Sequence, residues 1–103
     1  MTIVISVVNR FLRYEYGVAN DQLRAAICAN VVRRLSAARR RRRVSMNRLA
    51  QLAGLSQSMV SLVERDLRNP TLDTLLRIAH ALDVDLADIL KRAARAATRG
   101  KVV

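Results

Sequence analysis

Few residues in this chain have the type and spacing that catalysis or metal binding requires. His80 is the only histidine and Cys28 the only cysteine, so neither a cysteine-based metal cluster nor an intrachain disulfide can form. No Ser-His-Asp combination, paired carboxylates, glycine-rich phosphate loop or metal-ligand spacing is evident. We therefore expect no enzyme activity, no cofactor and no metal, with His80 facing solvent and Cys28 a buried, inert thiol.

The chemistry that the sequence offers instead is cationic. Nineteen Lys and Arg residues face eight Asp and Glu residues, which gives a net charge of +11. The excess is local, because residues 22–63 contain nine arginines and no acidic residue. Such a field attracts polyanions, of which nucleic acid is the commonest. A membrane surface or an acidic protein would be attracted by the same charge, so net charge alone does not identify the partner.

The elements that must position these side chains are helices. From residue 22 to about 42, apolar residues recur at a helical spacing, which predicts either one long helix or two shorter ones. Gly17 and the pair Asn20-Asp21 predict a break and an N-cap before it. Shorter helices are predicted over residues 46–53, 57–65, 72–82 and 86–96. Each has a capping residue in front: Ser45, Ser56, Thr71 and Asp85.

The predicted fold class is all-α, a five-helix domain over residues 21–97. Its chain length suits one compact domain. Residues 98–103 are expected to form a flexible tail. The buried faces are predicted from the helical spacing, and the stripe for 72–82 comprises Leu72, Leu75, Leu76, Ala79 and Leu82. For 86–96 the predicted apolar face comprises Leu86, Ile89, Leu90 and Ala93.

Residues 1–20 differ from the rest of the chain. Residues 3–8 are rich in β-branched side chains, as in a strand, whereas Val4, Val8 and Phe11 would line one face of a short helix. The apolar run is too short for a secretory or membrane-spanning segment, so a cytoplasmic protein is expected. The segment is either a dimerisation arm, since its apolar residues need a surface to bury them, or a disordered or upstream-start extension.

The most informative pattern lies in residues 46–65, where two helices would cross over a very short turn. Gly54 can adopt the positive φ that ends the first helix, and Ala50 allows the second helix to approach. The predicted core of this unit comprises Leu49, Ala50, Ala53, Gly54, Leu55, Val60 and Val63. The second helix then exposes Gln57, Ser58, Ser61 and Leu62, an arrangement in which a helix enters the major groove of DNA.

From residue 31 to residue 93 the sequence resembles the phage repressor/Cro-type helix-turn-helix domains, also called the xenobiotic-response-element family. The stretch LAQLAGLSQSMVSLVERDLRNPTLDTLLRIAHALDVDLADIL follows the family pattern almost continuously. The resemblance implies that Gln57, Ser58, Ser61 and Leu62 read DNA bases. In particular, Gln57 can pair with an adenine edge, and Leu62 can either touch a thymine methyl group or pack beneath the following helix.

The resemblance also implies residues that contact DNA phosphates and one structural ion pair. The phosphate contacts are expected at the start of the helix at 46 and in the loop after residue 64: Arg43, Met46, Asn47, Arg65, Arg68 and Asn69. Arg39 and Glu64 occupy positions that the family often pairs. Unlike the family's common pattern, Met46 replaces a glutamine, and Arg43 and Asp66 replace glycines. Either of the last two could adopt the left-handed conformation at modest cost, Asp66 more readily than Arg43.

The function expected from these features is sequence-specific binding of double-stranded DNA by a homodimer, as a transcriptional regulator, usually a repressor, on a palindromic operator. The helix at 86–96 is the candidate dimer surface. One alternative keeps the fold and makes the chain an antitoxin, with a small toxin protein as its partner, or a restriction–modification controller. A third is a protein-interaction module that no longer reads DNA; the small, neutral surface at Gln57, Ser58 and Ser61 argues against it.

Overall fold

The computed structural model describes the backbone of residues 17–102 and the side chains of residues 21–99. The described part of the chain contains five α-helices, joined by turns and loops, and no strand: α2 (Gly17–Arg41), α3 (Met46–Ala53), α4 (Gln57–Glu64), α5 (Leu72–Ala81) and α6 (Leu86–Val102). This confirms the all-α, five-helix prediction. The strand or short helix considered near the N-terminus lies outside the described residues, as do residues 1–16 of the possible dimerisation arm predicted over residues 1–20, whereas residues 17–20 form the start of α2.

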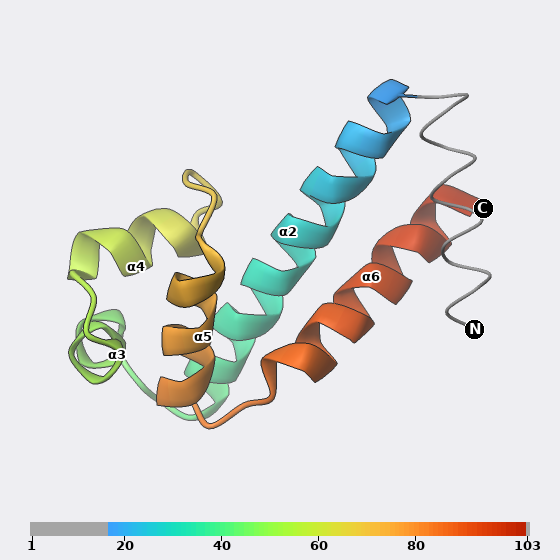
Figure 1. The fold of residues 1–103 in the computed structure, drawn as a ribbon. Helices are drawn as coiled ribbons and strands as arrows, with labels where there is room; N and C mark the ends of the chain where they lie inside the picture. The colour runs from blue at the N-terminus through green and yellow to red at the C-terminus, as the bar shows by residue number, and fades with distance from the viewer. Residues whose placement is uncertain (1–16, 103) are drawn as a thin grey trace.

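The helices form a three-helix body, made of α3, α4 and α5, and a pair of long helices, α2 and α6 (Figure 1). The long helices α2 and α6 run side by side in opposite directions, and α3, α4 and α5 gather around the C-terminal end of α2. The principal extents of 44 × 24 × 22 Å reflect this elongated arrangement. No helix in the described part is long and apolar enough to span a membrane.

One apolar core connects all of these helices. Its most deeply buried large side chains are Leu49 of α3, Val60 and Val63 of α4, and Leu82, which caps α5. They pack with Val31, Val32, Leu35 and Ala38 of α2 and with Leu86, Ile89 and Ala93 of α6. Since apolar burial is the main favourable term in folding, the short helices depend on this shared core for their stability.

The predicted caps are present at all four helix starts. The hydroxyls of Ser45 and Ser56 each accept a hydrogen bond from the amide three residues ahead, at 3.0 Å. Thr71 does the same at 3.1 Å, and the Asp85 carboxylate accepts from the amide of Ala87 at 3.0 Å. Each bond satisfies an amide that the helix itself leaves unpaired.

Several boundaries and burial predictions are wrong. α2 begins at Gly17, so Asn20 and Asp21 lie inside it, and Asp21 pairs with Arg24 instead of capping. α6 continues through Thr98 to Val102, beyond both the predicted end of the helix and the start of the predicted tail. The reason is tertiary: α2 and α6 pack against each other along their length, which local sequence signals do not reveal.

Three side chains predicted to be buried are exposed. Leu72, in the first turn of α5, is 62% exposed, and Leu90 of α6 is 37% exposed. In α5, Thr74 and Ile78 take the buried positions beside Ala79. Cys28 of α2 is also exposed. His80 is exposed as predicted.

We expect Leu49→Ala to lower the free energy of unfolding by about 2–5 kcal/mol, because it leaves a cavity at the centre of the core. Leu52→Ala, on the same helix but 49% exposed in the wild type, is the matched control and should cost about 0.5 kcal/mol or less. Chemical denaturation monitored by circular dichroism measures both. Equal losses of stability would contradict the placement of α3.

Candidate nucleic-acid interface

The candidate interface is centred on α4, which is buried on one side and uncovered on the other. Val60 and Val63 are among the most buried residues of the chain and hold the helix on the body. Gln57 and Ser58, in its first turn, are exposed, whereas Ser61 and Leu62 are half-buried. The two residues at the start of α4 are therefore the most accessible of the four predicted to read bases.

The turn between α3 and α4 fixes the angle at which the two helices cross. Gly54 has φ +69°, as predicted, and its amide donates to the α3 carbonyls of Ala50 and Gln51. A Cβ atom at Gly54 would lie 3.1 Å from a guanidinium nitrogen of Arg77. That guanidinium group donates to the Ala53 carbonyl at 3.4 Å, so α5 closes the end of α3 from outside.

Arg77 is held in place by its own helix. Its Nε donates to a carboxylate oxygen of Asp73 at 2.8 Å, one turn earlier on α5. This hydrogen bond and the attraction of the carboxylate raise the pKa of Arg77 above its ordinary value. The ion pair with Asp73 therefore holds the guanidinium group beside the turn. Sequence reasoning missed this contact, because the spacing between Ala53 and Arg77 is set by the packing of α5 on α3.

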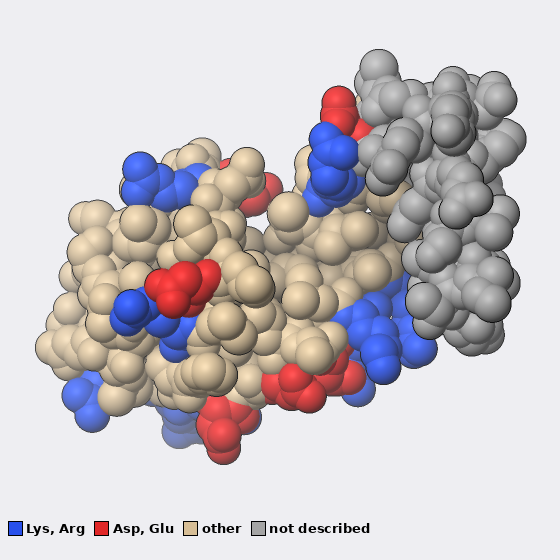
Figure 2. Space-filling view, viewed as in Figure 1, with Lys and Arg blue, Asp and Glu red and all other residues tan. Residues whose placement is uncertain are grey.

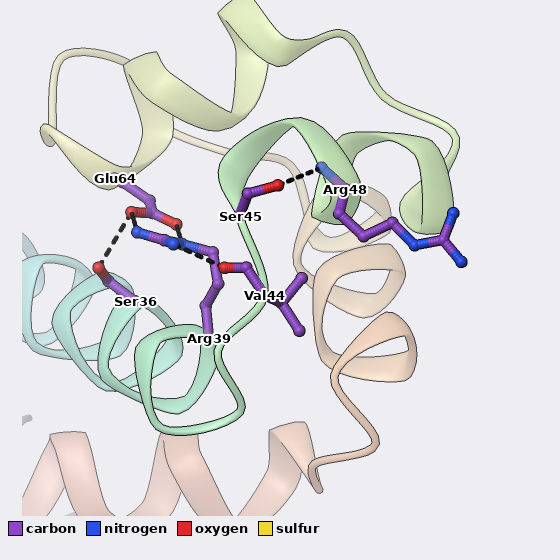
Figure 3. A network of polar contacts seen from close by, with 6 residues as sticks. All are labelled: Ser36, Arg39, Val44, Ser45, Arg48 and Glu64. Atoms are coloured by element: carbon purple, nitrogen blue, oxygen red, sulfur yellow. Dashed lines mark hydrogen bonds and ion pairs between the residues drawn. The ribbon is translucent and has the colours of Figure 1, made fainter.

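The other end of α4 is anchored by a nearly buried ion pair (Figure 3). Arg39 of α2 meets Glu64 with two parallel contacts, Nε to Oε2 at 2.6 Å and Nη2 to Oε1 at 3.0 Å. The two side chains are only 11% and 12% exposed. The predicted pair is therefore present, and its two-point geometry orients the carboxylate as well as holding it.

Two further contacts complete this network. Ser36 donates its hydroxyl to Glu64 Oε1 at 3.0 Å, and Arg39 Nη1 donates to the carbonyl of Val44 at 2.8 Å. The network thus joins α2, the 42–45 turn that leads into α3, and the last residue of α4. Ser36 lies three residues before Arg39, on a neighbouring part of the same helix face, and that spacing was the signal available in the sequence.

The start of α3 presents a second exposed region. Asn47 and Arg48 are exposed in the first turn, and Arg48 points away from the buried network in Figure 3. Met46, by contrast, packs against the core, so its side chain is turned away from any ligand and only its first-turn amide could bind a phosphate. Arg48 was not singled out by sequence reasoning, because the resemblance placed its contacts at the flanking positions.

The end of α2 and the turn that follows it carry the remaining basic residues of the run at 39–43. Arg40, Arg41, Arg42 and Arg43 are exposed, while Arg39 is turned inward as predicted. Arg43 has φ +56°, so it adopts the left-handed conformation expected where the family often has glycine. Arg42 donates to the Asp83 carbonyl at 3.4 Å. Arg43 lies three residues before Met46, the first residue of α3.

The loop after α4 forms the third exposed region. Asp66 has φ +56°, and the amides of Asp66 and Leu67 donate to the Val63 and Leu62 carbonyls at 3.0 and 2.9 Å. This left-handed turn ends α4 and exposes residues 65–69. A guanidinium nitrogen of Arg68 lies 3.8 Å from the sulfur of Met59, so the loop folds back beside α4.

The basic side chains near these regions are distributed around the end of the molecule that holds α3 and α4 (Figure 2). The acidic residues of the body are Asp73, which pairs with Arg77, Glu64, which lies inside the network, and Asp66 and Asp83, which hold left-handed turns. The first turns of α3 and α4 contain no acidic residue. An anionic ligand can therefore approach the exposed face of α4 with little repulsion nearby.

Comparison with known proteins gives consistent results. A helix-turn-helix family model matches residues 35–89. The immunity repressor protein of Bacillus phage phi105 is 38% identical over 60 residues, which span 58% of this chain and 42% of the phage protein. The crystal structure of the clp gene regulator ClgR from Corynebacterium glutamicum superposes with a TM-score of 0.64 at 24% identity, covering 74% of this chain and 81% of that one. Because its sequence identity is only 24%, this last match supports the fold and not the function.

We expect Glu64→Ala to lower the free energy of unfolding by about 3 kcal/mol or more, because it leaves the Arg39 guanidinium nearly buried without its counter-ion. Asp88→Ala removes the partner of Arg92 in an exposed pair on α6 and is the matched control, with an expected decrease of about 0.5 kcal/mol or less. Urea denaturation of both variants checks this. A decrease for Glu64→Ala no larger than that for Asp88→Ala would contradict the structural role of the pair.

Proposed function

The chain belongs to the helix-turn-helix family, and on that premise we propose that it binds specific sequences of double-stranded DNA and regulates transcription. The observation that carries this proposal is the uncovered first turn of α4, a short helix fixed at both ends and polar where it is exposed. The phage relative is named as an immunity repressor, which favours repression as the mode of regulation.

The proposed base-reading residues are Gln57, Ser58, Ser61 and Leu62. A glutamine side chain offers a donor and an acceptor that match the N6 and N7 groups of adenine, and a serine can serve as donor or acceptor. Gln57 and Ser58 are exposed at the tip of the helix and would enter the major groove most deeply. Leu62 is half-buried, so its remaining surface would make an apolar contact with a thymine methyl group.

The proposed phosphate contacts flank this helix on both sides. Asn47 and the first-turn amides of α3, including that of Met46, would bind one stretch of backbone, with Arg43 beside them. Arg65, Arg68 and Asn69 in the loop after α4 would bind another. Such contacts position a protein on duplex DNA without reading sequence. We add Arg48 to this set because it is exposed in the same turn as Asn47.

A homodimer on a palindromic operator is the proposed assembly. Two recognition helices about 34 Å apart would read successive major grooves on one side of the duplex. The exposed Leu90 on α6 supports this helix as the dimer surface, because a partner helix would remove its apolar side chain from water.

Selection of bound sequences from random duplexes, at a stated salt concentration, tests the proposed function directly. We expect enrichment of a two-fold symmetric site with half-sites about one helical turn apart. Failure to enrich any sequence over random competitor would refute sequence-specific binding.

On the selected site, Gln57→Ala should relax the preference at one base pair by about 1–3 kcal/mol, because it removes a two-point contact to one base. Fluorescence anisotropy with the selected duplex and its single-base variants measures this. Gln51→Ala, the same change at an exposed position on α3, is the control and should leave the base preferences unaltered. A uniform loss of affinity across all duplexes for Gln57→Ala would show that the residue does not read a base.

The phosphate contacts predict how affinity depends on salt. Removing one phosphate-binding side chain should reduce the slope of log K against log salt concentration by about 1, since each neutralised phosphate releases roughly 0.9 counterion. Arg68→Ala should reduce the slope by about 1 for each protomer bound to DNA, and the protein should keep its preference for each base of the selected site. Arg95→Ala, which removes an exposed arginine from α6, should leave the slope unaltered. Equal slopes for the Arg68 variant and the wild type would show that Arg68 does not contact a DNA phosphate.

A further inference from the structure

A groove of about 730 Å³ runs between the C-terminal half of α2 and the first turns of α6. Arg33, Ala37 and Arg41 lie along its α2 side at a spacing of four residues, which places them on one helix face. Asp85, Asp88 and Arg92 lie along its α6 side. In Figure 2 acidic side chains are visible at the start of α6, with basic ones beside them.

The charges of this groove do not cancel. Arg92 donates to the Asp88 carboxylate at 2.8 Å, and Asp85 accepts the amide of Ala87, so both acids of the α6 side already have partners. The side chains of Arg33 and Arg41 make no hydrogen bond or ion pair with another described residue. Arg34 is bonded only to the neutral Asn30, at 2.7 Å. The α2 side therefore carries a surplus of positive charge.

The groove also has an apolar component. Ala37 and Val84, both half-buried, lie between its charged edges, and Ala38 and Ile89, which also line it, are almost completely buried. The length of α2 that takes part, residues 30–41, is about 17 Å, which matches roughly three turns of a helix. A ligand that fits must be extended, apolar on one side and anionic on the other.

The groove faces away from the candidate DNA interface. At about 100° per residue, Arg39 is turned about 160° around the α2 axis from both Ala37 and Arg41. Arg39 reaches towards α4, where it binds Glu64, whereas Ala37 and Arg41 line the groove. A duplex seated on the exposed side of α4 is therefore separated from the groove by α2 itself.

We propose that this α2–α6 groove is the docking site for an acidic, amphipathic segment of a partner protein. The carboxylates of the segment would lie against Arg33, Arg34 and Arg41, and its apolar side would cover the half-buried Ala37 and Val84. The residues before Gly17 carry two arginines and one glutamate, so charge does not favour them as the occupant. The proposal goes beyond the DNA-binding function and does not rest on it.

A synthetic peptide of three Glu-Glu-Leu-Leu repeats is the probe, since a helix of that length matches the groove. Fluorescence anisotropy of the labelled peptide should show saturable binding to the full chain. The double variant Arg33→Glu/Arg41→Glu should weaken it about tenfold or more, because it places like charges opposite each other. The matched control Arg95→Glu/Arg99→Glu changes the net charge equally on exposed positions outside the groove and should weaken it less than about twofold.

A second experiment reverses the charges of both the groove and the peptide. A peptide of Lys-Lys-Leu-Leu repeats should bind the Arg33→Glu/Arg41→Glu variant more tightly than it binds the wild type, which also demonstrates that the variant is folded. Arg33→Gln/Arg41→Gln should bind both peptides weakly. These results would support the docking site and would hold whether or not the chain binds DNA.

Several outcomes would overturn it. Equal decreases in peptide affinity for the two glutamate double variants would mean that the peptide responds to net charge alone. Displacement of the peptide by inorganic pyrophosphate at a similar concentration would indicate a small-anion site, and a parallel decrease in affinity for random duplex DNA would indicate a nucleic-acid surface. A change in the mass of the unliganded protein on light scattering, caused by the groove substitutions and absent in the control, would indicate an interface between copies of this chain.

Discussion

The ion pair between Arg39 and Glu64 is the constraint on which the arrangement of this molecule depends. It joins the C-terminal part of α2 to the last residue of α4, and through the Val44 carbonyl it also fixes the turn that leads into α3. A two-point contact between nearly buried groups tolerates little displacement, because each misplaced bond would leave a desolvated charge. The short helices are therefore held in one register relative to the long one.

With one end of α4 fixed in this way, its other end is set by the turn at Gly54. The two constraints, with the buried contacts of Val60 and Val63, leave the polar first turn of α4 as the part that projects. An eight-residue helix has little stability of its own. Its precise presentation therefore comes from the body, which is what a helix that must match a DNA groove requires.

The same long helix separates two surfaces of different character. One side of α2 supports the three-helix body, and the opposite side forms the charged groove with α6. α2 therefore contributes residues both to the body that carries α4 and to the groove. The run of arginines at 39–43 is divided accordingly: Arg39 is internal and structural, Arg41 lines the groove, and Arg43 lies at the start of the turn towards α3.

The sequence by itself determined the all-α class, the caps of α3 to α6, the Gly54 turn, the core of α3 and α4 and the Arg39–Glu64 pair. These follow from short-range spacing and from a resemblance that extends over most of the domain. Tertiary structure alone decided where α2 begins and how far α6 continues, since those ends are stabilised by packing of two helices distant in the chain. It also decided that Cys28, Leu72 and Leu90 are exposed, because helical periodicity gives the direction of a side chain and only the neighbouring helices determine whether anything covers it.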